Sequence, residues 1–265
     1  MHSEQLDPRP VVIITGGGSG IGAAAAERLA QDYRVVICGR RQSALDTVAA
    51  RTGAVPMALD VTDYPANEAL VAEVAERFGR LDALVLNAGV VLSTAPHEIT
   101  IAQWEAQIAV NLTGAFVMTR AALPHLLRAK GAVVSVSSVG AMQTGPGLAA
   151  YSTAKAGLSH FTCCLAYEYA RQGLRANVVA PGWIRSEMAD EEMKMLPIGR
   201  DLDAAYAKVS EHVPQRRAGS SMEAAEAIAF LLSPAASFIN GAVLPVDGGS
   251  LIANSGMTYF DTVAS

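Results

Sequence analysis

Short apolar runs along the chain alternate with longer segments whose apolar residues recur at helical spacing. Short runs rich in β-branched residues are typical of strands buried on both faces, and the segments between them are long enough for helices. The predicted strands cover 11–14, 34–38, 55–59, 81–86, 132–138, 174–180 and 242–246. The predicted helices cover about 22–31, 64–78, 101–129, 151–171 and 222–232. This order predicts an α/β fold: a single doubly wound Rossmann-type domain with a parallel seven-stranded sheet flanked by helices on both faces.

All 265 residues are expected to belong to that domain, with 1–9 and 251–265 as terminal extensions. Segment 187–215 is rich in Met, Glu and Asp, and it is predicted to be a mobile substrate lid. Adaptable apolar side chains would cover an apolar pocket, with Trp183 at the base of the lid. These side chains are Met188, Met193, Met195 and Leu196. The alternative is that the methionines pack against a neighbouring subunit.

The first predicted strand runs into a glycine-rich turn, Thr15-Gly-Gly-Gly-Ser-Gly-Ile-Gly22, and then into a helix. Gly16 would permit a sharp turn, Gly20 a close approach of the backbone to a pyrophosphate, and Gly22 close packing of the helix. The free N–H groups of the helix N-terminus suit an anion. The spacing is G-x-x-x-G-x-G rather than the G-x-G-x-x-G of longer dehydrogenases, and a glycine-rich loop alone is often only a turn. The turn favours a nucleotide site without establishing one.

Two arginines follow the second predicted strand, in Gly39-Arg40-Arg41. In this fold the adenosine ribose of a dinucleotide lies here, and an NAD site usually supplies Asp or Glu for the 2′-hydroxyl group. Two guanidinium groups suit a 2′-phosphate instead. The sequence therefore predicts NADP(H), with NAD(H) as the alternative if Arg40 and Arg41 only begin a solvated helix.

The composition argues against several classes of partner. Only 17% of the residues are charged, and the net charge of −5 comes without a basic cluster, which disfavours nucleic acid and anionic membranes. The N-terminus lacks the apolar core of a signal peptide and no apolar run reaches membrane length, so a cytoplasmic protein is expected. No metal site is expected either, because the five histidines show no i, i+4 pairing and no cysteine partners. Cys38, Cys163 and Cys164 are interpreted as buried free thiols.

A second set of polar residues lies in the middle of the chain. Tyr151 and Lys155 are four residues apart at the start of a predicted helix, so their side chains should lie on one face. Ser138 ends the fifth predicted strand, and Asn111 interrupts an apolar helical stretch where its amide needs hydrogen-bond partners. Each residue alone has an ordinary structural explanation.

Taken together, the motifs resemble the compact branch of the short-chain dehydrogenase/reductase family, including 3-oxoacyl-carrier-protein reductases and related ketoreductases. The resemblance covers nearly the whole chain. It is carried by the Thr15–Gly22 turn, Asn87-Ala88-Gly89, Asn111, Ser138 with Tyr151-x-x-x-Lys155, and Pro181-Gly182. Ser186 stands where the family more often has Thr. Segment 187–215 is longer than in the compact acyl-carrier ketoreductases, which leaves the substrate open.

The resemblance implies an oxidoreductase that transfers a hydride between NADP(H) and a ketone or secondary alcohol. Tyr151 would be the general acid or base, and Ser138 would bind the substrate oxygen. Lys155 would favour the tyrosinate and hold the nicotinamide ribose, and Asn111 would fix a water that leads from Lys155 to solvent. The implied cofactor-binding residues are Gly16, Ser19, Gly20, Ile21, Arg40, Arg41, Asp60, Val61, Asn87, Ala88, Gly89, Tyr151, Lys155, Pro181, Gly182, Ile184 and Ser186. For Asp60 and Asn87 a purely structural role is an equal alternative.

Three further expectations follow. The chain is expected to form a homotetramer, because its long helices around Asn111 and Phe161 carry more apolar and small residues than one sheet face requires. The alternative functions are an NAD-dependent secondary-alcohol dehydrogenase and a non-catalytic dinucleotide-binding sensor. The substrate is expected to be a small carbonyl or alcohol compound, and acyl thioesters, polyketides, steroids and sugar-like alcohols all remain open.

Overall fold

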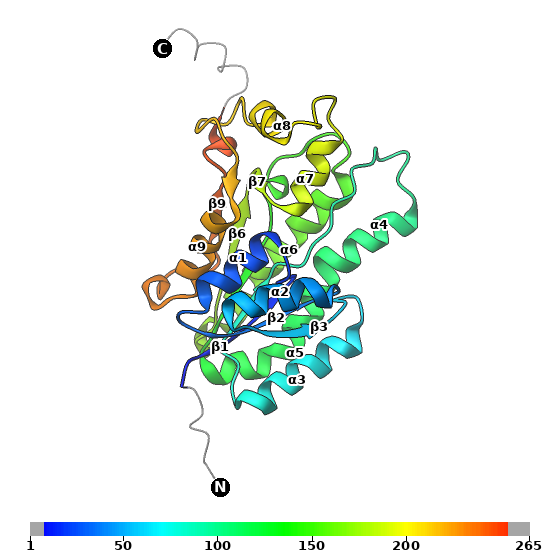
Figure 1. The fold of residues 1–265 in the computed structure, drawn as a ribbon. Coiled ribbons are helices and arrows are strands. Elements are labelled where there is room, and N and C mark those ends of the chain that lie inside the picture. Colours follow the sequence, from blue (N-terminus) through cyan, green and yellow to red (C-terminus); the bar gives the residue numbers. More distant parts are fainter. Residues whose placement is uncertain (1–7, 254–265) are drawn as a thin grey trace.

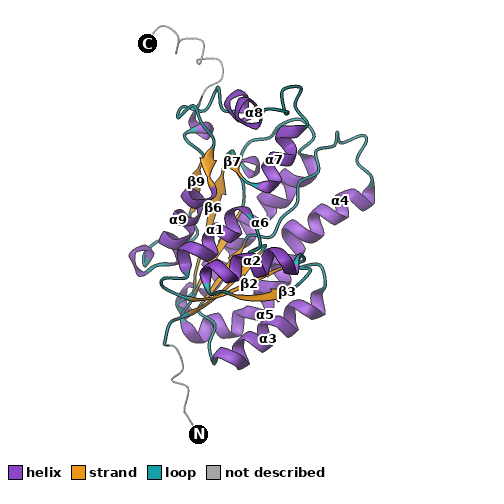
Figure 2. Cartoon of the chain, viewed as in Figure 1, coloured by secondary structure: helices purple, strands orange, loops and turns teal. Residues whose placement is uncertain are grey.

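The structure, a computed structural model, describes residues 8–253 (Figure 1). A parallel sheet runs through the molecule, and Figure 2 shows its strands enclosed by helices. Its strands are β1 (Val11–Thr15), β2 (Arg34–Gly39), β3 (Val55–Ala58), β4 (Ala83–Leu86), β5 (Ala132–Val136), β6 (Arg175–Pro181) and β9 (Val243–Val246). A short two-stranded sheet pairs β7 (Ile184–Arg185) with β8 (Gly219–Ser220). The predicted seven-stranded doubly wound sheet is confirmed.

Helices connect the strands of the large sheet. They are α1 (Gly20–Leu29), α2 (Gln42–Thr52), α3 (Tyr64–Phe78), α4 (Ile101–Ile108), α5 (Gly114–Ala129), α6 (Ala149–Tyr169), α7 (Glu187–Lys194), α8 (Leu202–Val209) and α9 (Ser221–Leu232). Two of the element ends near the polar residues differ from the predicted ones. Strand β5 ends at Val136 rather than Ser138, because the chain turns there into a short 3₁₀ helix over Val139–Ala141. Helix α6 begins before Tyr151, directly after a turn in which Gly147 has a φ of 74°.

The predicted helix over 101–129 is divided by a π-helical turn, η1 (Ala109–Thr113). A π turn holds one residue more than an α turn and occurs frequently at functional sites. Asn111 lies within this turn and is fully buried. The interruption that Asn111 suggested in the sequence is therefore a change of helix geometry.

The sheet is buried on both faces, because successive residues of a strand point to opposite sides. Val11 and Ile13 of β1 pack in one core with α3, α5 and α6. Val12 and Ile14 pack in the other core with α1, α2 and α9. This double burial explains why β1 reads as a continuous apolar run rather than an alternating one.

The strand order β3-β2-β1-β4-β5-β6-β9 places the reversal of the chain between β1 and β4. In such sheets ligands bind outside the carboxyl ends of the strands at this point. The glycine turn after β1 and the polar residues after β4 and β5 all lie at that edge. Topology alone therefore gathers motifs that are far apart in the sequence.

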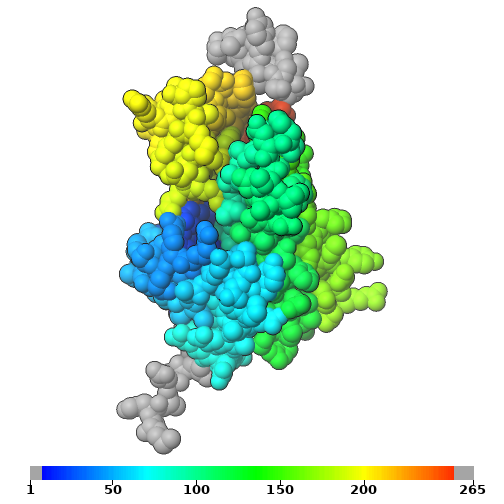
Figure 3. All heavy atoms as spheres, turned by 90° about the vertical axis from the view of Figure 1, so that its right-hand side faces the viewer, coloured from blue at the N-terminus to red at the C-terminus, as the bar shows by residue number. Residues whose placement is uncertain are grey.

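Segment 187–215 contains α7 and α8, which pack on each other around a small core of their own. Met193 and Tyr206 are buried in that core, and Leu196 packs against it. Of the four side chains expected over the pocket, Met188 lines the cavity, whereas Met195 is 79% exposed. Figure 3 shows this segment in yellow above the blue N-terminal region, with a hollow between them.

Two further findings concern the cysteines and the membrane. Cys38 is buried as expected, but Cys163 is half-buried and Cys164 is exposed, so the expectation of buried thiols was wrong for that pair. Both lie on α6, whose outer face is not covered by the sheet. No helix in the described part of the chain is long and apolar enough to cross a membrane.

Candidate active site

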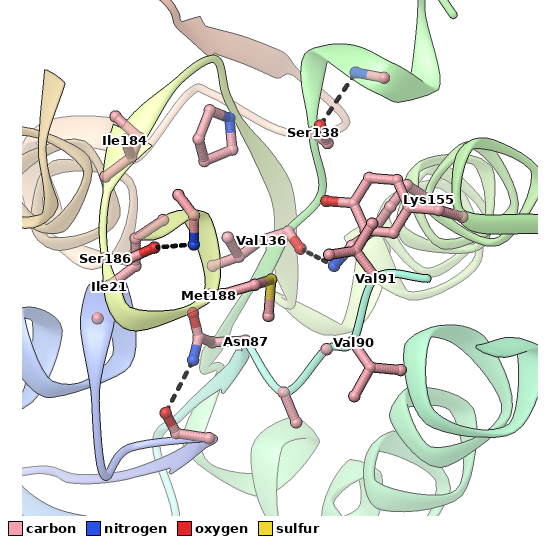
Figure 4. A pocket seen from close by; sticks show the side chains of 18 of the residues that line it. Ile21, Asn87, Val90, Val91, Val136, Ser138, Lys155, Ile184, Ser186 and Met188 are labelled. Atoms are coloured by element: carbon pink, nitrogen blue, oxygen red, sulfur yellow. Dashed lines mark hydrogen bonds between the residues drawn. The ribbon is translucent and has the colours of Figure 1, made fainter. Parts of the chain in front are cut away.

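A cavity of about 660 Å³ lies at the carboxyl edge of the sheet, between the glycine turn and α7. Its walls contain every residue predicted to bind the cofactor, together with Ser138 of the predicted catalytic set. Asn111 is the exception, since it lies buried behind the cavity wall. Figure 4 shows how side chains from several elements point into the same space.

The glycine turn is packed too tightly for side chains. A Cβ atom at Gly22 would lie 2.2 Å from the Gly16 carbonyl oxygen, and Gly16 itself has a φ of 67°. Both positions therefore require glycine. Ser19 is the N-cap residue of α1, but its side chain accepts no hydrogen bond from the first N–H groups of the helix. These N–H groups belong to residues at the cavity wall, where they suit an anion.

Asn87 ties this turn to the end of β4. Its Nδ2 donates hydrogen bonds to the carbonyl oxygens of Thr15 at 2.9 Å and Gly16 at 3.1 Å. The Thr15 hydroxyl group in turn accepts hydrogen bonds from the N–H groups of Asn87 and Ala88, each at 3.0 Å. Asn87 thus joins two strand ends and also lines the cavity, so both of its expected roles are compatible with its position.

The far end of the cavity is formed by the carboxyl ends of β2 and β3. Hydrogen bonds from Thr62 are the main cause of the lowered pKa of Asp60. Arg40 is exposed there, and its charge lowers this pKa further. Arg41 donates hydrogen bonds to Ser19 at 3.2 Å and to the Glu187 carboxylate at 2.7 Å. This second contact connects the arginine pair to the first residue of α7.

Asn111 has all of its expected hydrogen-bond partners. Its Oδ1 accepts a hydrogen bond from the Val90 N–H group at 3.1 Å, and its Nδ2 donates to the carbonyl oxygens of Val90 and Gln107, each at 2.9 Å. A Cβ atom at Gly89 would lie 2.8 Å from Asn111 Oδ1 and 3.3 Å from Lys155 Nζ. Asn111 and Lys155 therefore flank the same glycine, and only glycine fits between them.

Tyr151 and Lys155 lie on the same face of α6, as their spacing predicts. Lys155 Nζ is 5.8 Å from the centre of the Tyr151 ring and donates a hydrogen bond to the Val136 carbonyl oxygen at 2.9 Å. Ser138 lies next to Tyr151, and its Oγ accepts a hydrogen bond from the Gly140 N–H group at 3.0 Å. Three polar side chains, one from the turn after β5 and two from α6, thus converge on one part of the cavity.

Burial dominates the electrostatics of this group. It lowers the pKa of Lys155 to about 8. Burial also raises the pKa of Tyr151, with a hydrogen bond from Ser138 opposing the shift and the charge of Glu192 adding to it. The sequence led us to expect that Lys155 would favour the tyrosinate, whereas the pKa of Tyr151 is raised mainly by its own burial. The ammonium group of Lys155 is itself buried and donates its hydrogen bond to Val136. Desolvation disfavours the charged form of a buried phenol.

Some residues at the cavity were not singled out by the sequence. Val136 lines the cavity and accepts the Lys155 hydrogen bond through its backbone oxygen, and Gln143 and Thr144 lie in the loop before α6. Glu192 of α7 lines the cavity one helical turn after Met188, which points into it in Figure 4. The i, i+4 spacing of Met188 and Glu192 was a signal that could have identified Glu192.

Comparison with known proteins decides the family. A family model described as enoyl-(acyl carrier protein) reductase matches residues 16–250. Meso-2,3-butanediol dehydrogenase of Serratia marcescens is 37% identical over 244 residues, covering 91% of this chain and 94% of that protein. The chain belongs to the short-chain dehydrogenase/reductase family. The resemblance inferred from the motifs is thereby confirmed.

Solved structures agree with this assignment. The crystal structure of levodione reductase matches with a TM-score of 0.86 at 33% identity, covering 92% of this chain and 98% of that one. A variant of actinorhodin polyketide ketoreductase, solved with NADPH, matches with a TM-score of 0.86 at 34% identity, covering 91% and 97%. As a short-chain dehydrogenase/reductase, the protein is an NAD(P)-dependent oxidoreductase that acts on carbonyl and alcohol groups.

The residues present fit a dinucleotide cofactor. The space that Gly16 and Gly22 keep free of side chains adjoins the N-terminus of α1, where backbone N–H groups suit a pyrophosphate. Arg40 and Arg41 lie at one end of the same cavity and Lys155 with Tyr151 at the other. Adenosine and nicotinamide thus each have a matching set of residues in one continuous space.

Proposed function

We propose that this short-chain dehydrogenase/reductase interconverts a ketone and a secondary alcohol with NADP(H), using Tyr151 as the general acid and base. One observation carries the proposal: Tyr151, Ser138 and Lys155 converge in the cavity that also contains the glycine turn and Arg40. The bound nicotinamide would supply or accept the hydride. The residues of this chain would orient the substrate and move the proton.

In the reducing direction the substrate oxygen would accept hydrogen bonds from Ser138 and Tyr151, and Tyr151 would then donate its phenolic proton. The raised pKa of Tyr151, caused mainly by burial, keeps this proton in place at neutral pH. In the oxidising direction the same group must act as a base, so alcohol oxidation is expected to become faster as the pH rises toward the pKa of Tyr151.

Lys155 would hold the nicotinamide ribose and supply a positive charge near Tyr151. Asn111 would fix a water between Lys155 and solvent, and its position across Gly89 from Lys155 Nζ supports this role. Its amide also holds the backbone of Val90, which lines the cavity. Asn111 would therefore act as a positioning residue rather than by contact with the substrate.

The preference for NADP(H) rests on the end of the cavity near β2. Gly39 provides no carboxylate for a 2′-hydroxyl group, and Arg40 is an exposed guanidinium that lines the cavity. A charge-assisted contact with a phosphate contributes about 1.5 to 3 kcal/mol. We therefore favour NADP(H) over the alternative of an NAD-dependent alcohol dehydrogenase.

The relatives point to carbonyl compounds of different kinds. Their names specify a butanediol, levodione and a polyketide, so they support a ketone or secondary alcohol without selecting one. A panel of ketones and alcohols, run with NADPH, NADH and their oxidised forms and followed by nicotinamide absorbance, tests the proposal. Turnover with NADPH supports it, a clear preference for NADH supports the NAD alternative, and cofactor binding without any turnover supports a sensor.

The general-acid role makes a direct prediction for Tyr151→Phe. This change removes the proton donor but keeps the ring, so turnover should fall by at least about 10² to 10⁴ while the cofactor Kd stays nearly unchanged. Steady-state kinetics and fluorescence titration of NADPH would measure both. Tyr167→Phe, on the exposed side of the same helix, is the matched control. A Tyr151→Phe protein with a tenth of the wild-type activity would contradict the assignment.

A further inference from the structure

Glu192 is a carboxylate on the lid side of the cavity. It lies on α7, and its side chain is half-buried against the space that Tyr151 faces. Its charge contributes to the raised pKa of Tyr151, so the two groups interact across the cavity. Val90, Val91 and Leu148 make part of the surrounding wall apolar. Glu192 is therefore placed to meet the part of a substrate that extends beyond the reacting carbon.

The other carboxylates that line the cavity already have partners. Asp60 accepts hydrogen bonds from Thr62, and Glu187 is paired with Arg41 at 2.7 Å. Glu191 is exposed and is paired with Lys194 at 2.5 Å. Within residues 8–253, the Glu192 carboxylate has no hydrogen-bond or ion-pair partner. Burial raises its pKa.

A partly buried carboxylate without a donor is unfavourable, because it has lost part of its hydration without gaining hydrogen bonds. An ionised carboxylate can only accept hydrogen bonds, so the group that compensates it must be a donor. A plain ketone brings no donor, and a substrate with its own carboxylate would be repelled. A hydroxyl group on the substrate supplies the donor without introducing a further charge.

We propose that Glu192 selects substrates that carry a second hydroxyl group, as hydroxyketones and diols do, over plain ketones and over substrates with a carboxylate. The inference rests on the proposed ketone and alcohol activity, and it deepens that proposal by naming the substrate class. Glu192 acts on specificity, whereas Tyr151 and Ser138 carry the chemistry.

Matched substrate pairs test this directly at pH 7.5. The hydroxyketones carry the hydroxyl group one, two or three carbons from the carbonyl, and in each partner compound a methyl group replaces the hydroxyl. Acetoacetate represents substrates with a carboxylate. Aminoacetone carries an ammonium group, so it shows whether Glu192 prefers a hydroxyl group or a cation. The quantity compared is the ratio of kcat/KM for a hydroxyketone to kcat/KM for its partner.

For the best pair, Glu192→Leu should lower this ratio about tenfold to a hundredfold, as expected for the loss of a charge-assisted hydrogen bond. Glu192→Gln keeps an accepting oxygen and should lower it less. Both variants should increase the relative rate with acetoacetate. Glu191→Gln, which removes the neighbouring carboxylate that is paired with Lys194, should leave the ratio unchanged.

Two negative results are distinguishable. If plain ketones are reduced but the ratio is the same in wild-type protein and Glu192→Leu, or if aminoacetone is preferred to every hydroxyketone, the inference about Glu192 is wrong and the proposed function stands. If no compound is reduced with either cofactor, the proposed function is wrong. In that case the inference about Glu192 is tested by calorimetric titration of the hydroxyketones into wild-type protein and Glu192→Leu. Equal hydroxyketone affinities of the two proteins would overturn it.

Discussion

At the scale of single residues, Lys155 is a buried cation whose proposed role comes at the expense of stability. Its ammonium group is almost completely buried and has one protein hydrogen-bond acceptor, the Val136 carbonyl oxygen. Burial lowers its pKa from 10.5 to about 8. The unfolded chain therefore holds this proton at pH values where the folded chain has already released it.

This difference predicts that folding stability rises with pH between about 8 and 10.5, because the unfolded state binds more protons in that window. The contribution amounts to about 3 kcal/mol at most. Urea unfolding of wild-type protein and Lys155→Met at pH 7.5 and pH 10 would measure it. The stability of wild-type protein relative to the variant should increase with pH, and a constant difference would show that Lys155 keeps an ordinary pKa.

Arg40 carries the proposed cofactor preference at the other end of the cavity. Exchanging Gly39 for Asp and Arg40 for Leu should reverse the preference, because a 2′-hydroxyl acceptor replaces a phosphate partner. The change is sterically mild, since a Cβ atom at Gly39 would meet its nearest neighbour, Leu45, at 3.8 Å. Fluorescence titrations should show NADP(H) affinity reduced about ten- to a hundredfold and NAD(H) affinity increased.

Salt provides the control for this exchange. In wild-type protein, added salt should weaken NADP(H) binding more than NAD(H) binding, since only the phosphate forms the additional ion pair. Tighter binding of NAD(H) than of NADP(H) by wild-type protein at low ionic strength would contradict the role given to Arg40.

At the level of elements, we expect α7 and α8 to move together as a lid. They share a small core around Met193 and Tyr206, and the Tyr206 hydroxyl group donates a hydrogen bond to Asp190 at 2.8 Å. The ion pair between Arg41 and Glu187 links α7 to the opposite rim of the cavity. Both of these side chains are 62% exposed, and such surface pairs contribute little stability. The connection is weak enough to open.

Hydrogen exchange tests this lid. Amides of 187–215 should exchange more slowly when NADP(H) and a substrate are bound, because closure would protect them. Glu187→Gln should speed exchange of the same segment in the free protein, while amides of α9 serve as an internal reference. An exchange pattern of 187–215 that cofactor and substrate leave unchanged would exclude a mobile lid.

At the level of the whole molecule, the outer surface of α5 and α6 carries aromatic side chains. Phe116 and Phe161 pack edge to face with ring centres 5.8 Å apart, and Phe116 is 44% exposed. Tyr167 on α6 is 87% exposed. A surface of this kind on two neighbouring helices suits pairing with a second copy across a two-fold axis.

We therefore expect a homotetramer in solution. Light scattering at micromolar concentration would measure its mass. Tyr167→Glu should shift the protein toward smaller species, because a charge would be buried in the contact between copies. Met195→Glu, which changes an apolar side chain of similar exposure in segment 187–215, should not. A monomeric wild-type protein would contradict the expectation.

The sequence by itself determined the sheet, the glycine turn and the spacing of the polar residues. These features are local, because runs of β-branched residues, glycines at a turn and an i, i+4 pair of side chains depend on near neighbours in the chain. The end of β5 and the beginning of α6 are exceptions, because they depend on turns at Val139–Ala141 and Gly147 that the motifs did not reveal.

Only the tertiary structure decided how the site residues interact. Tyr151 has a raised pKa mainly because it is buried, and burial is a property of the folded chain. Asn111 obtained its partners from Val90, and Glu192 obtained its place opposite Tyr151 from the packing of α7 across the cavity. Desolvation and contacts between distant segments arise when strands and helices come together, so no local pattern in the sequence encodes them.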